Sequence, residues 1–344
     1  MIEKKVLSAL CAGAVFALSA FSQDVSSLIE EAKLKGGLIS HIGCGNGETT
    51  AKLFKNETFL VHGLDTSEEN IEKAREHIKS NGIYGKVSVE LYNGEALPYV
   101  ENLVNMIVCD ERNNITDDEL LRVLVPNGIA FVKENGKYRK IVKPIRKELD
   151  DWSHSMYDSA GGGISQDGIV GPPKHLQWDG APRWTRFHEA MSTFHTMVSL
   201  NGKVFYILDD GPQVNVKLPA QWKLVARDAY NGAKLWERKL GKWVQQRSYK
   251  SGPAFVMRLL VAAENKLFTV DEIYGHLVVI DQTTGKKLYE YPETKGVEEI
   301  VYYKGNVFLS VFPNPKDLKK VVKTPNGDKG SGYAGAWKND KKWI

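Results

Sequence analysis

The sequence predicts two folded units: an α/β domain with a doubly wound sheet, followed by an all-β region arranged as an incomplete β-propeller. Three observations predict this. Strand-like and helix-like segments alternate from Gly36 to about Val142, and a glycine-rich loop follows the first strand-like segment. Short β-branched and aromatic segments then repeat from Met197 onward. A length of 344 residues agrees with two domains.

Residues 1–22 have the pattern of a cleavable export signal. Lys4 and Lys5 make the amino-terminal region positively charged, and an uncharged segment rich in alanine, leucine and valine follows. Ala20 and Ser22 fit the small residues that precede a cleavage site, here at Gln23. The run is shorter than the about 20 residues of a membrane span. We therefore expect an exported protein, periplasmic or secreted, with no integral membrane segment after cleavage.

Net charge and cysteine content limit the partners and the kinds of site that this protein can have. A formal net charge of +4 is too small to indicate a nucleic-acid partner. Cys44 and Cys109 lie beyond the signal, and two buried thiols are a simpler interpretation than a disulfide framework. The sequence has no CxxC or HExxH pattern, so no metal site is predicted.

The α/β region alternates regularly. Strands are expected over 37–43, 59–65, 86–94, 103–111 and 128–133, and helices over 47–56, 67–82 and the first part of 117–128. Ser67 or Thr66 should cap the long helix, and Gly82 should end it. Such alternation gives a parallel sheet whose ligands bind beyond the carboxyl ends of the strands.

The glycine loop marks a Rossmann-like binding site. Gly43, Gly45 and Gly47 follow the first strand, and without Cβ atoms they allow a tight turn and a close ligand. A helix beginning near Glu48 would turn free N–H groups toward the loop. Asp65 ends the second strand, where an acidic side chain accepts hydrogen bonds from ribose hydroxyls.

Four stretches resemble class I S-adenosylmethionine (SAM)-dependent methyltransferases: "IGCGNG", "VHGLDTSEENIEKAR", "YNGEALPY" and "RVLVPNGIAFV". The spacing of the first fits that family better than the dinucleotide pattern GxGxxG. The resemblance implies SAM as the cofactor, transfer of its methyl group, and residues that flank the adenine after the third strand. The implied cofactor-binding set is Gly43, Gly45, Gly47, Asp65, Glu95 and Ala96.

Two acidic residues are candidates for catalysis, and several positions depart from the family. Much of methyl transfer is positioning, so no single catalytic group is required. Asp110 and Glu111, at the end of the fourth strand, are candidate bases, with a solvated loop as the alternative. The family has an acid at the position of His41 and another at that of Asn105. Only "KYRKIVKPI" could add a strand after Val132, so the last strands and the substrate cover are largely missing.

The predicted boundaries are a signal peptide over 1–22, the methyltransferase-like domain over 23–149, a linker over 150–196 and repeats over 197–344. The linker is rich in glycine, proline and tryptophan and reads as ordered but irregular. It carries scattered histidines, for which packing or surface roles are favoured over a metal or catalytic triplet: His154, His175 and His188.

The β-rich region contains two self-similar segments, "LVARDAYNGAKLWERKL" and "LVVIDQTTGKKLYEYPE". Their spacing of about 50 residues is typical of a propeller blade. The unit resembles the repeat of pyrroloquinoline-quinone (PQQ) enzymes, in which Asp228 and Asp281 would make a turn and Trp236 and Tyr289 would pack between blades. The repeats alone do not predict bound PQQ.

The β-rich region holds about three such units, whereas closed propellers have about four to eight. We therefore expect a fragment of a longer chain with an open sheet edge. Three functions remain open at this point. The first is a SAM-dependent methyltransferase. The second is an exported, non-catalytic scaffold with a degenerate Rossmann-like domain and a propeller that binds a protein partner. The third is a quinone-dependent dehydrogenase.

Overall fold

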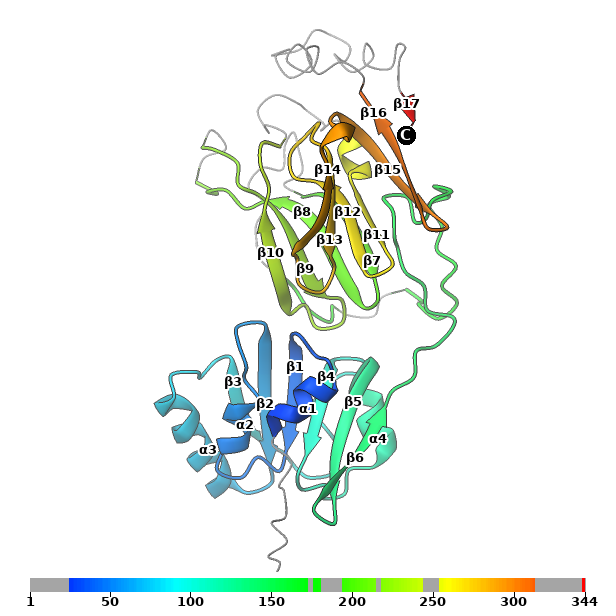
Figure 1. The fold of residues 1–344 in the computed structure, drawn as a ribbon. Helices are drawn as coiled ribbons and strands as arrows, with labels where there is room; N and C mark the ends of the chain where they lie inside the picture. The colour runs from blue at the N-terminus through cyan, green and yellow to red at the C-terminus, as the bar shows by residue number, and fades with distance from the viewer. Residues whose placement is uncertain are drawn as a thin grey trace, which may run out of the picture.

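A computed structural model describes residues 25–172, 176–180, 194–214, 218–243, 254–312 and 342–343. The predicted export signal over 1–22, together with His175 and His188, lies outside these residues. The described residues form an α/β domain and a β-rich domain (Figure 1). Among the helices of the described part, none has the length and apolar character needed to cross a membrane.

The α/β domain is built on a six-stranded sheet of order β3-β2-β1-β4-β5-β6. The strands from β3 to β5 are mutually parallel, as the alternating pattern predicts, and β6 runs antiparallel to β5. The sheet is therefore mixed. The strands are β1 (Gly37–Ile42), β2 (Phe59–Asp65), β3 (Val87–Leu91), β4 (Val104–Cys109), β5 (Leu124–Glu134) and β6 (Lys137–Val142).

A tight turn explains the antiparallel strand. Asn135 and Gly136 both have positive φ, 51° and 78°, which is the backbone of a two-residue hairpin turn. A parallel continuation would need a crossover of about a dozen residues. The chain instead reverses directly from β5 into β6, and the expectation of a purely parallel sheet was wrong at this edge.

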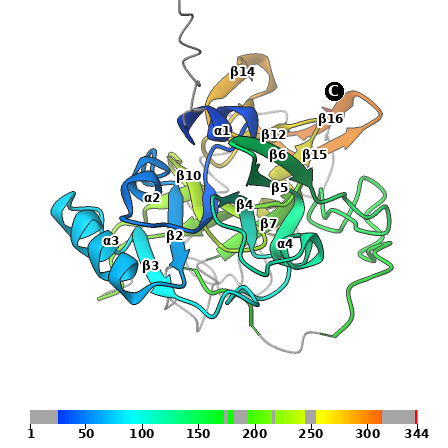
Figure 2. The same cartoon turned by 90° about the horizontal axis from the view of Figure 1, so that it is seen from below.

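Helices cover both faces of the sheet. Side chains alternate along β4, so Met106 and Val108 pack on the face with α1 and α3, and Ile107 and Cys109 on the face with α4. Figure 2 views this domain from the side away from the β-rich domain. The helices are α1 (Val25–Glu31), α2 (Glu48–Lys52), α3 (Glu68–Ser80) and α4 (Asp117–Val123).

The long helix is confirmed, whereas the helix after the glycine loop is shorter than predicted. Ser67 caps α3 by accepting a hydrogen bond of 3.3 Å from the Asn70 N–H, and Gly82 follows its end with φ 68°. The helix α2 has only five residues and ends at Lys52. Its first N–H groups follow the glycine loop, as predicted, but the helix itself is little more than one turn long.

The β-rich domain contains four-stranded antiparallel sheets of order β10-β9-β8-β7 and β11-β12-β13-β14, and a three-stranded sheet of order β15-β16-β17. The predicted antiparallel sheets are present, but their arrangement as an incomplete propeller is not confirmed. Its elements are β7 (Phe194–Leu200), β8 (Lys203–Asp209), β9 (Trp222–Asp228), β10 (Lys234–Lys239), η2 (Ala254–Arg258), β11 (Leu260–Ala263), β12 (Lys266–Val270), β13 (Leu277–Asp281), β14 (Lys287–Tyr291), η3 (Pro292–Thr294), β15 (Val297–Tyr303), β16 (Asn306–Val311) and β17 (Lys342–Trp343).

The repeated turns pack against tryptophans of neighbouring segments. The Trp236 indole N–H donates to the Gln282 carbonyl over 2.9 Å, and a Cβ on Gly285 would lie 2.7 Å from that indole. Trp178 lies against the corresponding glycine of the first sheet and donates to the Ala229 carbonyl over 2.9 Å. The predicted contact of Trp236 with the next sheet is therefore confirmed, while Tyr289 is 58% exposed.

The aspartates of the two repeats make the predicted turns. Asp228 Oδ1 accepts hydrogen bonds from the Tyr230 and Asn231 N–H groups over 2.9 and 3.1 Å. Asp281 Oδ1 accepts the equivalent bonds from the Thr283 and Thr284 N–H groups over 3.1 and 2.7 Å. Such side-chain to backbone bonds satisfy N–H groups of the turn, where the hydrogen-bond ladder between the two strands ends.

The start of the linker crosses the β-rich domain. The Ser153 carbonyl accepts a hydrogen bond from the Ala262 N–H in β11 over 2.9 Å. His154 Nε2 accepts one from the Tyr302 N–H in β15 over 3.1 Å, and burial lowers the pKa of this histidine. His154 therefore acts in packing, since its acceptor nitrogen is already used.

The two domains meet at the amino edge of the α/β sheet. Asn105, in β4, donates to Asp228 Oδ2 over 2.7 Å, and its Oδ1 accepts from Asn231 Nδ2 over 2.6 Å and the Leu38 N–H over 2.8 Å. Asn231 also donates to the Leu103 carbonyl over 2.9 Å. An aspartate in place of Asn105 would oppose Asp228, which accounts for the departure from the family at that position.

Candidate active site

The carboxyl edge of the α/β sheet carries the residues that the sequence predicted for cofactor binding and catalysis. This edge faces away from the β-rich domain (Figures 1 and 2). Neighbouring strands present their carboxyl ends in the order β3, β2, β1, β4. The residues at these ends are Glu95 and Ala96 after β3, Asp65 on β2, the three loop glycines after β1, and Asp110 and Glu111 after β4.

The three loop glycines have different reasons for lacking a side chain. A Cβ on Gly43 would lie 2.7 Å from the Glu111 Cβ, and a Cβ on Gly47 would lie 2.8 Å from the Ala74 Cα. Their φ angles of 77° and 83° also disfavour other residues. A Cβ on Gly45 would meet nothing within 4 Å. Packing therefore explains two of the glycines, and the third faces open space where a ligand can approach the backbone.

Asp65 is held beside this opening. One carboxylate oxygen accepts from the Gly45 N–H over 2.9 Å, and the other accepts from the Ser67 N–H over 2.9 Å and from Asn70 Nδ2 over 3.1 Å. The residue is only 3% exposed. A carboxylate offers about four acceptor positions, so three internal bonds leave one for a ribose hydroxyl. Sequence reasoning missed Asn70, whose signal was its place in the first turn of the helix after Asp65.

The loop after β3 is organised by a side chain that the sequence did not single out. Asn93 Oδ1 accepts hydrogen bonds from the Glu95 and Ala96 N–H groups over 3.0 and 3.3 Å. Both of the latter residues are exposed. Within the part of the chain that the structure describes, the Glu95 carboxylate has no hydrogen-bond partner, so it is available to a ligand's amino group.

Asp110 is tied to His41, the residue that departs from the family pattern. His41, 1% exposed, lies with Nε2 3.2 Å from Asp110 Oδ2 and Nδ1 2.7 Å from the Thr50 hydroxyl. Asp110 Oδ1 accepts from the Tyr138 hydroxyl over 2.5 Å and lies 3.4 Å from Lys133 Nζ.

These contacts decide the protonation of Asp110. Burial alone would raise the pKa of its carboxyl, but hydrogen bonds from His41 and Tyr138, together with the electrostatic attraction of His41 and Lys133, lower the pKa to about 2. A carboxylate with so low a pKa is a poor proton acceptor at neutral pH. The exposed Glu111 is therefore the better candidate base of the two.

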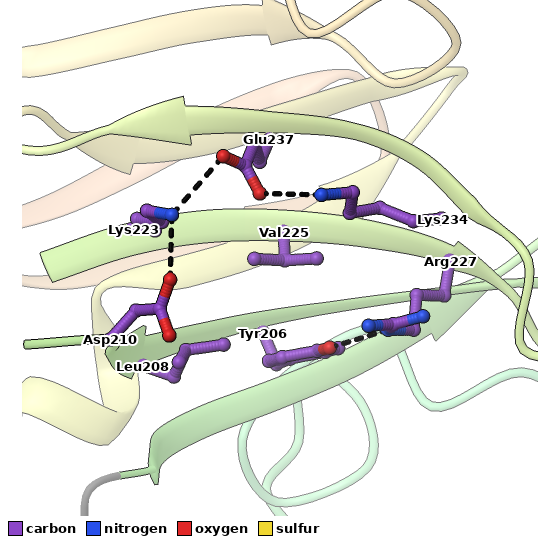
Figure 3. Close-up of a pocket in the computed structure, with 8 residues that line it drawn as sticks. All are labelled: Tyr206, Leu208, Asp210, Lys223, Val225, Arg227, Lys234 and Glu237. Atoms are coloured by element: carbon purple, nitrogen blue, oxygen red, sulfur yellow. Dashed lines mark hydrogen bonds and ion pairs between the residues drawn. The ribbon is translucent and has the colours of Figure 1, made fainter. Parts of the chain in front are cut away.

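A hollow also lies on the β-rich domain. It lies on one face of the first sheet. Four of its charged side chains form ion pairs, and the Arg227 guanidinium donates to the Tyr206 hydroxyl over 2.7 Å (Figure 3). Lys223 lies 2.7 Å from Asp210 and 3.1 Å from Glu237, which also pairs with Lys234 over 2.9 Å. Each of these charged groups therefore already has a partner within the sheet.

The two cysteines beyond the signal are free and buried, as predicted. Burial raises the pKa of both Cys44 and Cys109 to about 12, so neither is a thiolate at neutral pH. In the described ranges, no three histidine, cysteine, aspartate or glutamate side chains gather as metal ligands do.

Known proteins resemble this part of the chain. The sequence profile of a methyltransferase domain matches residues 39–136. The match includes the glycine loop, Asp65, the loop after β3 and the end of β4, and it supports a SAM-dependent methyltransferase with SAM as its cofactor.

Curated relatives cover the same part of the chain. The ubiquinone/menaquinone biosynthesis C-methyltransferase UbiE of Klebsiella pneumoniae is 30% identical over 142 residues, covering 39% of this chain and 56% of the relative. The UbiE of Escherichia coli O1:K1 is 29% identical over 141 residues, covering 39% and 55%. The chain thus spans about half the length of the curated relatives it matches.

Solved structures also align with the methyltransferase domain. Geranyl diphosphate C-methyltransferase from Streptomyces coelicolor is 17% identical, with a TM-score of 0.29, and the alignment covers 31% of this chain and 43% of that one. A SAM-dependent methyltransferase from Methanosarcina mazei is 22% identical, with a TM-score of 0.27, covering 30% and 55%.

Proposed function

We propose that this chain binds SAM along the carboxyl edge of its α/β sheet and transfers the methyl group to an acceptor. The observation that carries the proposal is the open side of Gly45, next to the one acceptor position that remains on Asp65. In this arrangement Glu95 and Ala96 flank the adenine, Asp65 binds a ribose hydroxyl, and the methionine part points toward β4.

The residues of this edge act mainly by positioning. Bound SAM supplies a methyl group carried on a positively charged sulfur. The loop holds the ligand at a fixed distance from the strand ends, and such orientation provides much of the rate gain in a bimolecular transfer. The carboxyl groups of Asp65 and Asp110 at this edge favour a cationic ligand. Glu111 is exposed beside the loop, where it can accept a proton from the acceptor.

The β-rich sheets belong, in our proposal, to a PQQ-type propeller that presents a surface to a protein partner in an exported protein. The Asp228 and Asp281 turns and the contact of Trp236 with Gly285 support this repeat. This domain docks at the amino edge, so it does not cover the proposed SAM site. Because the two domains could therefore work independently, a non-catalytic scaffold is the second candidate function. It applies if the chain does not bind SAM.

The test is calorimetric titration of the full 344-residue chain with SAM. We expect saturable binding that Asp65→Ala weakens by at least about tenfold, the effect of losing a hydrogen bond to a charged group. Glu72→Ala, an exposed carboxylate on α3, is the matched control and should bind as the unaltered chain does. No heat at millimolar SAM would refute the proposal.

A further inference from the structure

We propose that Asp110 binds the α-ammonium group of SAM and that His41 is the positioning residue that aims it. This inference rests on the proposed function and deepens it. It assigns to the pair a role in cofactor binding, in place of the role in proton transfer that the sequence suggested for Asp110.

The order of the strands places the ligand's amino-acid end. SAM is an elongated molecule with adenosine at one end and an amino acid at the other. With the adenine at the end of β3 and the ribose at Asp65 on β2, the rest of the molecule continues across β1 toward β4. The Asp110 N–H donates to the Ile42 carbonyl over 2.9 Å, so Asp110 lies directly beside the start of the glycine loop.

Asp110 is the carboxylate at this end that is both fixed and open to a ligand. Tyr138 and Lys133 hold its Oδ1, and His41 holds its Oδ2. Each carboxylate oxygen has about two acceptor positions, so Oδ2 keeps one. The side chain is 19% exposed, enough for an ammonium group to reach it. Asp65 is less suited to this role, because it is only 3% exposed and three internal hydrogen bonds already occupy its carboxylate.

His41 determines the direction of that carboxylate. It lies on β1 under the loop and is anchored by the Thr50 hydroxyl of α2, at 2.7 Å. With its proton on Nε2, the ring donates to Asp110 and accepts from Thr50, so both ring nitrogens are used. The carboxylate that the resemblance leads one to expect at position 41 is absent, and the histidine there holds a carboxylate of the neighbouring strand instead.

The experiment compares three ligands on the full chain by calorimetry: SAM, S-adenosylhomocysteine and 5′-methylthioadenosine. S-adenosylhomocysteine keeps the ammonium group but has no sulfonium charge, and methylthioadenosine has neither. We expect Asp110→Asn to weaken both SAM and S-adenosylhomocysteine by about tenfold or more, as loss of a charge-assisted hydrogen bond does, and to leave methylthioadenosine binding unchanged.

Control variants keep the result interpretable. Unchanged methylthioadenosine binding shows that Asp110→Asn still folds. His41→Gln should lower SAM affinity by a smaller factor and also spare methylthioadenosine, whereas a merely structural loss would weaken all three ligands alike. If Asp110→Asn weakens all three equally, weakens SAM alone, or weakens none, the inference is wrong. If the unaltered chain binds none of them, the proposed function itself fails.

Discussion

Replacing Asn105 with aspartate would test how the two domains are joined. In the folded chain, Asn105 Nδ2 donates to Asp228 Oδ2 over 2.7 Å, and both residues are buried, with 8% and 7% exposure. The variant would replace this donor with a carboxylate oxygen. It would leave the acceptor side of the residue, which binds Leu38 and Asn231, in place.

The expected loss in the free energy of unfolding follows from the burial of Asn105 and Asp228. A buried charge that loses its partner destabilises a protein by about 3–5 kcal/mol. Burial already raises the pKa of Asp228, and a second carboxylate would raise it further. When folding raises the pKa of a carboxyl group, that group favours the folded state at a pH below its pKa in the unfolded chain. This contribution to stability is lost as the pH rises through the pKa of the folded state. The variant should therefore be weakest at neutral pH and recover as the solution becomes acidic.

Urea denaturation followed by two spectroscopic signals measures this loss of stability. Tryptophan fluorescence reports on the β-rich domain, where Trp178 donates to the Ala229 carbonyl beside the Asp228 turn, and far-ultraviolet circular dichroism reports on the helices of the α/β domain. The double variant Asn105→Asp with Asp228→Asn exchanges the carboxylate and the amide, and should regain most of the lost stability. An unchanged midpoint for Asn105→Asp, or no recovery in the double variant, would refute the reasoning.

Three further predictions concern single sites. Asp110, with a pKa lowered to about 2 from 3.8, contributes about 2 kcal/mol above pH 4 that is lost as pH falls toward 2, and Asp110→Asn should abolish this loss in acid unfolding curves. Gly285→Ala should cost about 2 kcal/mol in urea, since φ is 70° and the new Cβ meets an indole at 2.7 Å, whereas Gly305→Ala, with open space, should cost less. Cys44 and Cys109 should resist thiol reagents at neutral pH until urea is added, and fast labelling of the folded chain would contradict their burial.

Local sequence was sufficient for the elements that carry the site. The alternation of apolar segments predicted β1 to β5, and Ser67 predicted the start of α3, because periodicity and capping depend on near neighbours. The glycine loop and Asp65 followed from requirements on the backbone and from strand order. The sequence also showed that His41 stands where the methyltransferase family has an acid, but it did not show that His41 contacts Asp110.

Tertiary structure decided what those residues contact. His41 meets Asp110 across 69 positions of the chain, and Asn105 meets Asp228 across 123 positions. No periodic pattern encodes such pairs, because they arise only when strands and domains pack together. The same packing turned Asp110 from a candidate base into a fixed carboxylate of low pKa, and placed the β-rich domain at the edge opposite the proposed cofactor site.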